Sequence, residues 1–147
     1  MHLEISVAPA PTALADGHAA LARGDWPEAR AAFEAAIAVE PTPEAWEGLG
    51  WACWWLSDEA ATFRAREEAY RGYRERKDPA AAGRVAAWVA SDFREFRGED
   101  AVGRGWLGRA HRLLDGLPPS PDHGWLALHE GSYALNVAGD PEEAEQS

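Results

Sequence analysis

Short polar segments rich in proline, glycine and aspartate interrupt the chain at nearly regular intervals. Several of them place an Asp or a Thr directly before a proline, which is the pattern of a helix N-cap followed by proline in the first turn. Between the breaks, apolar residues recur at helical spacing, as Ala29, Phe33 and Ala36 do. No segment alternates apolar and polar residues with a period of two, so we expect helices and no strands.

The breaks predict eight helices, at approximately 11–23, 26–39, 43–56, 58–76, 79–97, 100–115, 121–138 and from 141 onward. The same breaks are periodic. Asp25 and Asp58 are 33 residues apart, and the steps from Asp58 to Glu99 and from Glu99 to Asp140 are 41 residues each. Helix pairs with this spacing cannot bury their apolar faces alone and must stack on their neighbours. The pattern therefore predicts an all-α fold of the α-solenoid kind.

We expect two regions along the chain. Residues 1–10 form a flexible N-terminus, and residues 11–147 form one helical-repeat domain. The last helix begins at Asp140 and Pro141 and has room for about two turns before Ser147, which is a marginal length for an isolated helix. We therefore expect the repeat domain to be truncated at its C-terminal end.

The acidic charge of the chain narrows the classes of partner. The formal net charge is −11 and the sequence pI is about 4.8. Binding to nucleic acid by this segment is not expected, because phosphate contacts need a basic surface. Anionic membrane surfaces are disfavoured for the same reason. A basic partner remains open, as does the simpler interpretation that acidic surfaces keep the protein soluble.

The single cysteine and the N-terminal segment indicate in which cellular compartment the protein is expected. Cys53 lies in an apolar helix and cannot form an intrachain disulfide, so we interpret it as a core residue. The first eleven residues contain Glu4 and no Lys or Arg, unlike the basic start of a signal peptide. The uncharged runs are too short to span a bilayer. We expect a cytoplasmic protein.

A group of small and aromatic residues resembles the tetratricopeptide repeat (TPR) family. The chain carries Ala29, Phe33, Ala36 and Pro41 at the spacing of the second TPR helix, and it carries Trp46, Leu49 and Gly50 at that of the first. Gly17 and the turn Gly24-Asp25-Trp26 also match. The resemblance is specific over residues 13–50 and loose over 51–147, where Thr62 and Arg66 replace the expected Ala and Phe. It implies a right-handed solenoid of antiparallel helix pairs with about three and a half repeats.

A second resemblance covers most of the chain. The segments 106–118, 124–128 and 138–141, together with Arg23-Gly24-Asp25-Trp26, resemble the helical-repeat region of actinobacterial LuxR-type transcriptional regulators. In that family a long helical-repeat region precedes a C-terminal helix-turn-helix that binds DNA. The resemblance implies a sensor or interaction region, and the DNA-binding module is not in this chain. The alternative is a stand-alone TPR adaptor that mediates protein–protein interaction.

The TPR resemblance also implies a binding groove, because the first helix of each pair lines the concave face in that family. Trp51, Trp54 and Trp55 share one helical face at i, i+3 and i+4. Alignment of the later repeats adds further candidates to the same groove, namely Trp88, Asp92, Glu95, Phe96, His129, Tyr133 and Asn136. Such a surface suits a protein, a peptide, or a small apolar or cationic ligand. The competing interpretation is that the tryptophans are core residues.

Motifs for chemistry are not found in the sequence. There is no glycine-rich phosphate loop, no set of Cys and His at metal-ligand spacing and no nucleophile elbow, so we expect no enzyme, cofactor or metal. One helix carries five arginines among acidic residues, which we interpret as a salt-bridged outer face. They are Arg64, Arg66, Arg71, Arg74 and Arg76. An open solenoid end with unburied apolar surface favours self-association, so a homo-oligomer is also expected.

Overall fold

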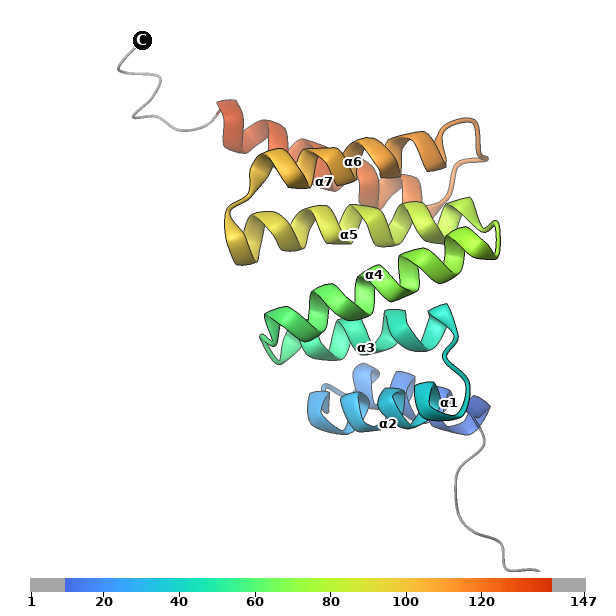
Figure 1. Cartoon of the computed structure of the whole chain (residues 1–147). Coiled ribbons are helices and arrows are strands. Elements are labelled where there is room, and N and C mark those ends of the chain that lie inside the picture. Colours follow the sequence, from blue (N-terminus) through green and yellow to red (C-terminus); the bar gives the residue numbers. More distant parts are fainter. Residues whose placement is uncertain (1–9, 139–147) are drawn as a thin grey trace, which may run out of the picture. The chain divides into compact units, whose positions relative to one another are not determined.

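The structure is a computed structural model that describes residues 10–138, apart from the side chains of residues 10, 11, 132 and 134–138. Within this range it is all-helical (Figure 1). The helices are α1 (Ala10–Ala22), α2 (Trp26–Val39), α3 (Pro43–Trp55), α4 (Glu59–Glu75), α5 (Pro79–Arg97), α6 (Asp100–Leu114) and α7 (Pro121–Ala138). The all-α prediction is confirmed, and the predicted ends of these helices agree with the observed ones to within one residue.

Three expectations fall partly or wholly outside this range. The predicted flexible N-terminus at 1–10 and the predicted eighth helix from 141 onward lie outside the described residues, except that Ala10 already belongs to α1. The predicted C-terminal truncation also concerns that end of the chain. The described residues divide into two compact units, one up to Gly72 and one from Tyr73 onward, with the boundary inside α4. Each unit is described by itself below.

The helices begin where the sequence predicts capping. The side chains of Asp25, Thr42, Asp58 and Asp78 accept hydrogen bonds from the backbone N–H groups of Glu28, Ala45, Ala61 and Ala81. Several helices end on a residue in the left-handed region, at Gly24, Ser57, Lys77 and Gly98. The acidic residue that follows each of them starts the next helix, so a two-residue sequence ends one helix and begins another.

In the first unit, α1, α2 and α3 pack around the ring of Phe33, which is fully buried on α2. A Cβ at Gly17 on α1 would lie 2.7 Å from this ring, and a Cβ at Gly48 on α3 would overlap it. Gly17, which matches the TPR pattern in the sequence, therefore leaves the space that the Phe33 ring fills. Gly48, and not Gly50, supplies the matching space on α3, because Gly50 faces Ala65 and Arg66 on α4.

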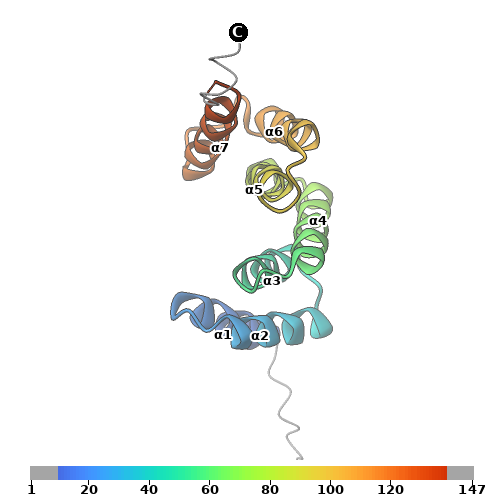
Figure 2. The ribbon, with the colours of Figure 1, turned by 90° about the vertical axis from the view of Figure 1, so that its left-hand side faces the viewer.

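In the second unit, α5 packs against both α6 and α7, and α6 packs against α7. Figure 2 shows these three helices nearly end-on. Tyr133 on α7 is buried, and its hydroxyl donates a hydrogen bond to the carbonyl oxygen of Ala90 on α5. A Cβ at Gly103 on α6 would overlap that hydroxyl. The three helices therefore meet at one tyrosine, for which the α6 glycine leaves space.

Gly48→Ala should destabilise the protein by about 1–3 kcal/mol, because the new methyl group overlaps Phe33 and forces the ring or α3 to move. The matched control is Gly105→Ala, since Gly105 also lies inside a helix but would meet nothing within 4 Å. This control should be neutral or stabilising by up to about 1 kcal/mol, because alanine favours helix. Urea unfolding followed by circular dichroism measures both, and equal effects of the two changes would contradict the role of Phe33.

Candidate functional site

Trp51, Trp54 and Trp55 lie together on one side of α3, and Trp26 from α2 joins them. The rings of Trp26 and Trp55 stack, with centroids 4.6 Å apart and an interplanar angle of 3°. Trp54 meets Trp55 edge-on at 4.9 Å and meets Trp51 edge-on at 6.0 Å. We call these four residues the Trp55 cluster. Half of the surface of Trp55 is exposed, so the cluster presents aromatic surface to solvent.

One face of Trp51 is already covered by a cation from the same unit. The guanidinium carbon of Arg66 lies 4.6 Å from the Trp51 ring centroid, and Arg66 is almost fully buried. Arg66 occupies the position where the TPR pattern places an aromatic residue, next to Gly50. The prediction that the arginines of α4 form a salt-bridged outer face is wrong at Arg66, because Arg66 is buried. It agrees with the structure at Arg71, which pairs with Glu68 at 3.2 Å.

The later candidates lie in the second unit. Trp88 on α5 packs against two rings of α7, with centroids 5.2 Å from Trp125 and 4.6 Å from His129. Asp92, one turn after Trp88, is fully buried, and His129 is buried as well. These side chains therefore belong to the packing between α5 and α7 rather than to an open surface.

The other candidates of the second unit differ in their surroundings. Glu95 is exposed, with its carboxylate 3.5 Å from the Ser91 hydroxyl and 4.0 Å from the Arg94 guanidinium. Phe96 is partly buried. Tyr133 is buried at the meeting point of three helices, and this burial raises the pKa of its phenol. The side chain of Asn136 lies outside the described residues. Tyr133 is thus a packing residue and does not line an open groove.

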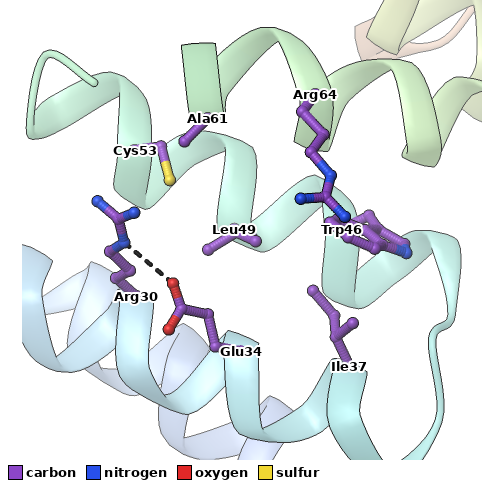
Figure 3. A pocket seen from close by; sticks show the side chains of 8 residues that line it. All are labelled: Arg30, Glu34, Ile37, Trp46, Leu49, Cys53, Ala61 and Arg64. Atoms are coloured by element: carbon purple, nitrogen blue, oxygen red, sulfur yellow. Dashed lines mark hydrogen bonds and ion pairs between the residues drawn. The ribbon is translucent and has the colours of Figure 1, made fainter. Parts of the chain in front are cut away.

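A cavity that the sequence did not reveal lies among α2, α3 and α4 of the first unit (Figure 3). Its volume is about 270 Å³. Three sets of side chains line it, which are Arg30, Glu34 and Ile37 from α2, Trp46, Leu49 and Cys53 from α3, and Ala61 and Arg64 from α4. Trp46, Leu49 and Cys53 follow one another at i, i+3 and i+7, away from the face that carries Trp51. This spacing is visible in the sequence, but it does not identify a cavity, because it is equally typical of residues in a packed core.

An ion-pair network borders one side of the cavity. Arg30 contacts Glu34 on its own helix through Nε and contacts Asp58 at the start of α4 through Nη1, both at 3.0 Å. The hydrogen bonds that Arg30 donates to the carboxylates of Glu34 and Asp58 raise the pKa of its guanidinium. The hydrogen bond from the Ala61 amide, followed by that from Arg30, lowers the pKa of Asp58. Arg30 therefore stays charged and ties α2 to the beginning of α4.

Cys53 and Arg64 also line the cavity, and their environments differ. Cys53 is fully buried, as predicted, and burial raises the pKa of its thiol. Arg64 is exposed on α4, and its guanidinium carbon lies 5.7 Å from the Trp46 ring centroid. Among the residues that the structure describes, Arg64 forms no ion pair. It is a cation at the edge of an apolar cavity.

Two classes of site are not found in the described part of the chain. Residues 10–138 contain no group of three or more His, Cys, Asp or Glu side chains that could hold a metal ion. Within the same range, no helix combines the length and the hydropathy that a bilayer-spanning segment requires.

Comparison with protein-family models, with curated proteins and with solved structures finds no match to this chain. The resemblances to TPR proteins and to LuxR-type regulators are therefore carried by residues of the sequence alone.

Asp58→Asn should make the protein less stable at pH 7 by about 0.2–1 kcal/mol, because asparagine can cap α4 but cannot pair with Arg30. The lowered pKa of Asp58 means that the folded state holds its proton less tightly than the unfolded state does. Wild-type stability from this group is therefore present above about pH 3.8, the ordinary value for this carboxyl, and is lost as the pH falls further.

Urea unfolding at pH 7 and at pH 3 measures this effect in wild type, Asp58→Asn, Arg30→Gln and the double variant. The two single changes should be non-additive at pH 7, and the coupling should shrink at pH 3. Additive effects at both pH values would show that the pair does not hold α2 to α4.

Proposed function

We propose that this chain is a TPR-like binding domain, a right-handed solenoid of antiparallel helix pairs, and that it serves as the N-terminal sensing or interaction region of a LuxR-type transcriptional regulator in the cytoplasm. The observation that carries the binding role is the Trp55 cluster. A half-exposed tryptophan stacked on a second tryptophan exposes apolar surface in a pre-ordered geometry, and such residues dominate the binding energy of protein interfaces.

The chemistry of the cluster favours a protein or peptide partner over a compact cation. The Trp51 face already holds Arg66, so an external cation would have to compete with an intramolecular one. Among the described residues no cation lies over the ring of Trp26 or Trp55, and half of the Trp55 surface is exposed. The net charge of −11 favours a partner segment that adds basic residues around an apolar anchor. The chain itself is proposed to contact neither nucleic acid nor membrane.

Selection of a peptide-display library on the immobilised protein tests the interaction role. Peptides with an aromatic or aliphatic anchor should be enriched, and Trp55→Ala should weaken their binding at least about tenfold, because an interface anchor typically contributes 2 kcal/mol or more. Trp125→Ala is the matched control, since Trp125 is also substantially exposed but lies in the second unit. Circular dichroism checks that both variants fold. Peptides that bind wild type and Trp55→Ala equally would exclude the cluster as the docking surface.

The second candidate is a stand-alone TPR adaptor, which the same surface would also serve. The mass of the protein purified from its native source distinguishes the two, together with the reading frame beyond the Ser147 codon. For a regulator we expect a longer chain that contains a basic helix-turn-helix, since DNA binding needs a basic module that this acidic segment lacks. A native protein that ends at Ser147 would exclude the regulator and leave the adaptor.

A further inference from the structure

The cavity among α2, α3 and α4 has the dimensions and the walls of a small-molecule site. A cavity of about 150 Å³ is enough to hold benzene, and this one measures about 270 Å³. Ile37 from α2 and Trp46 and Leu49 from α3 form the apolar walls of this space (Figure 3). These walls suit an aromatic ring system larger than benzene, such as a fused pair of rings.

The charges around the cavity favour an anionic group on that ring. The positive charge of Arg30 is balanced by two carboxylates, those of Glu34 and Asp58, at 3.0 Å each. Arg64 has no acidic partner among the described residues and lies over the Trp46 ring. An arginine stacked on an indole keeps the N–H groups at the edge of its guanidinium available, and these match both oxygens of a carboxylate.

The position of Arg64 gives the anion a defined location. Figure 3 shows its guanidinium beside Trp46 at one end of the cavity, whereas Arg30 and Glu34 lie towards the other end. A carboxylate on Arg64 therefore avoids the negative charge of Glu34, and the ring to which it is attached reaches the apolar walls. A cationic ligand would instead meet Arg64 at the apolar end and would have to share Glu34 with Arg30.

We propose that this cavity binds a small aromatic carboxylate, with its ring against Ile37, Trp46 and Leu49 and its carboxylate on Arg64. The site lies on a different face of α3 from the Trp55 cluster. It therefore goes beyond the interaction role proposed above and does not depend on it.

Calorimetric titration of the intact chain with three probes of one shape tests the charge preference. The probes are 1-naphthoate, the neutral 1-naphthalenemethanol and the cationic 1-naphthylmethylammonium. Naphthoate should bind at least about tenfold more tightly than the alcohol, because a hydrogen-bonded ion pair adds to the shared burial of the ring. The ammonium probe should bind most weakly. An ammonium probe that binds as well as naphthoate, or naphthoate that does not bind at millimolar concentration, would overturn the proposal.

Two variants locate the binding in the cavity. Arg64→Gln should weaken naphthoate about ten- to a hundredfold and leave the alcohol unchanged, whereas the control Arg71→Gln, on the same helix but outside the cavity, should change neither. Ala61→Leu places a larger side chain in the empty space and should weaken all probes together. Equal affinities of the two arginine variants for naphthoate would exclude Arg64 as the anion site.

The only cysteine of the chain gives an independent readout, because Cys53 lines the cavity. Because Cys53 is fully buried, its alkylation requires a local opening of the cavity walls. Saturating naphthoate should slow this reaction in wild type and should not slow it in Ala61→Leu. An unchanged rate in wild type would show that the probe binds elsewhere and would overturn the proposal. None of these variants alters Trp26 or Trp55, so peptide binding at the Trp55 cluster can succeed or fail separately.

Discussion

The packing of both units depends on an aromatic ring that occupies the space a neighbouring helix leaves at a glycine. Phe33 meets Gly17 and Gly48 in the first unit, and the Tyr133 hydroxyl meets Gly103 in the second. Helices that lack a side chain at the point of contact can approach more closely, and the ring then fills the gap that remains. The cavity residues depend on this contact directly, because Arg30 and Ile37 lie one turn before and after Phe33 on α2, and Leu49 follows Gly48 on α3. A displaced ring would move both walls of the cavity at once.

The helices were predictable from the sequence because their limits are set locally. Capping at Asp25, Thr42 and Asp78 involves residues three positions apart. The left-handed residues Gly24 and Lys77 directly precede two of these caps. Side-chain surroundings were less predictable, because they depend on a third helix. Gly48 and Gly50 look equivalent on α3, and only the placement of α2 and α4 decides that one faces Phe33 and the other faces Arg66. The burial of Asp92 and Tyr133 depends in the same way on how α5 meets α7.

The cavity was hidden from the sequence for a related reason. Residues that line an empty space between helices follow the same apolar spacing as residues that fill it, so Trp46, Leu49 and Cys53 read as core. From the sequence, Arg64 was interpreted as part of a salt-bridged outer face, because acidic residues surround it along the chain. In the structure the arginines instead lie over aromatic rings, Arg64 over Trp46, Arg66 over Trp51 and Arg109 over Trp106. In a chain with 25 acidic and 14 basic residues, arginines on rings leave several aromatic faces closed to external cations.

The position of the cavity also determines what a ligand there can influence. Its lining comes from three consecutive helices, α2, α3 and α4. A molecule that touches all three adds its binding free energy to those contacts and shifts the folded population by mass action. It can change the geometry of the helices only if it binds one arrangement more tightly than another. Asp58 is the residue on which such a preference would act, since it caps α4 and also holds Arg30 at the cavity border. A ligand that displaced Arg30 would therefore also disturb the carboxylate that caps α4. Arg30 at the cavity border and the N-terminus of α4 share the carboxylate of Asp58.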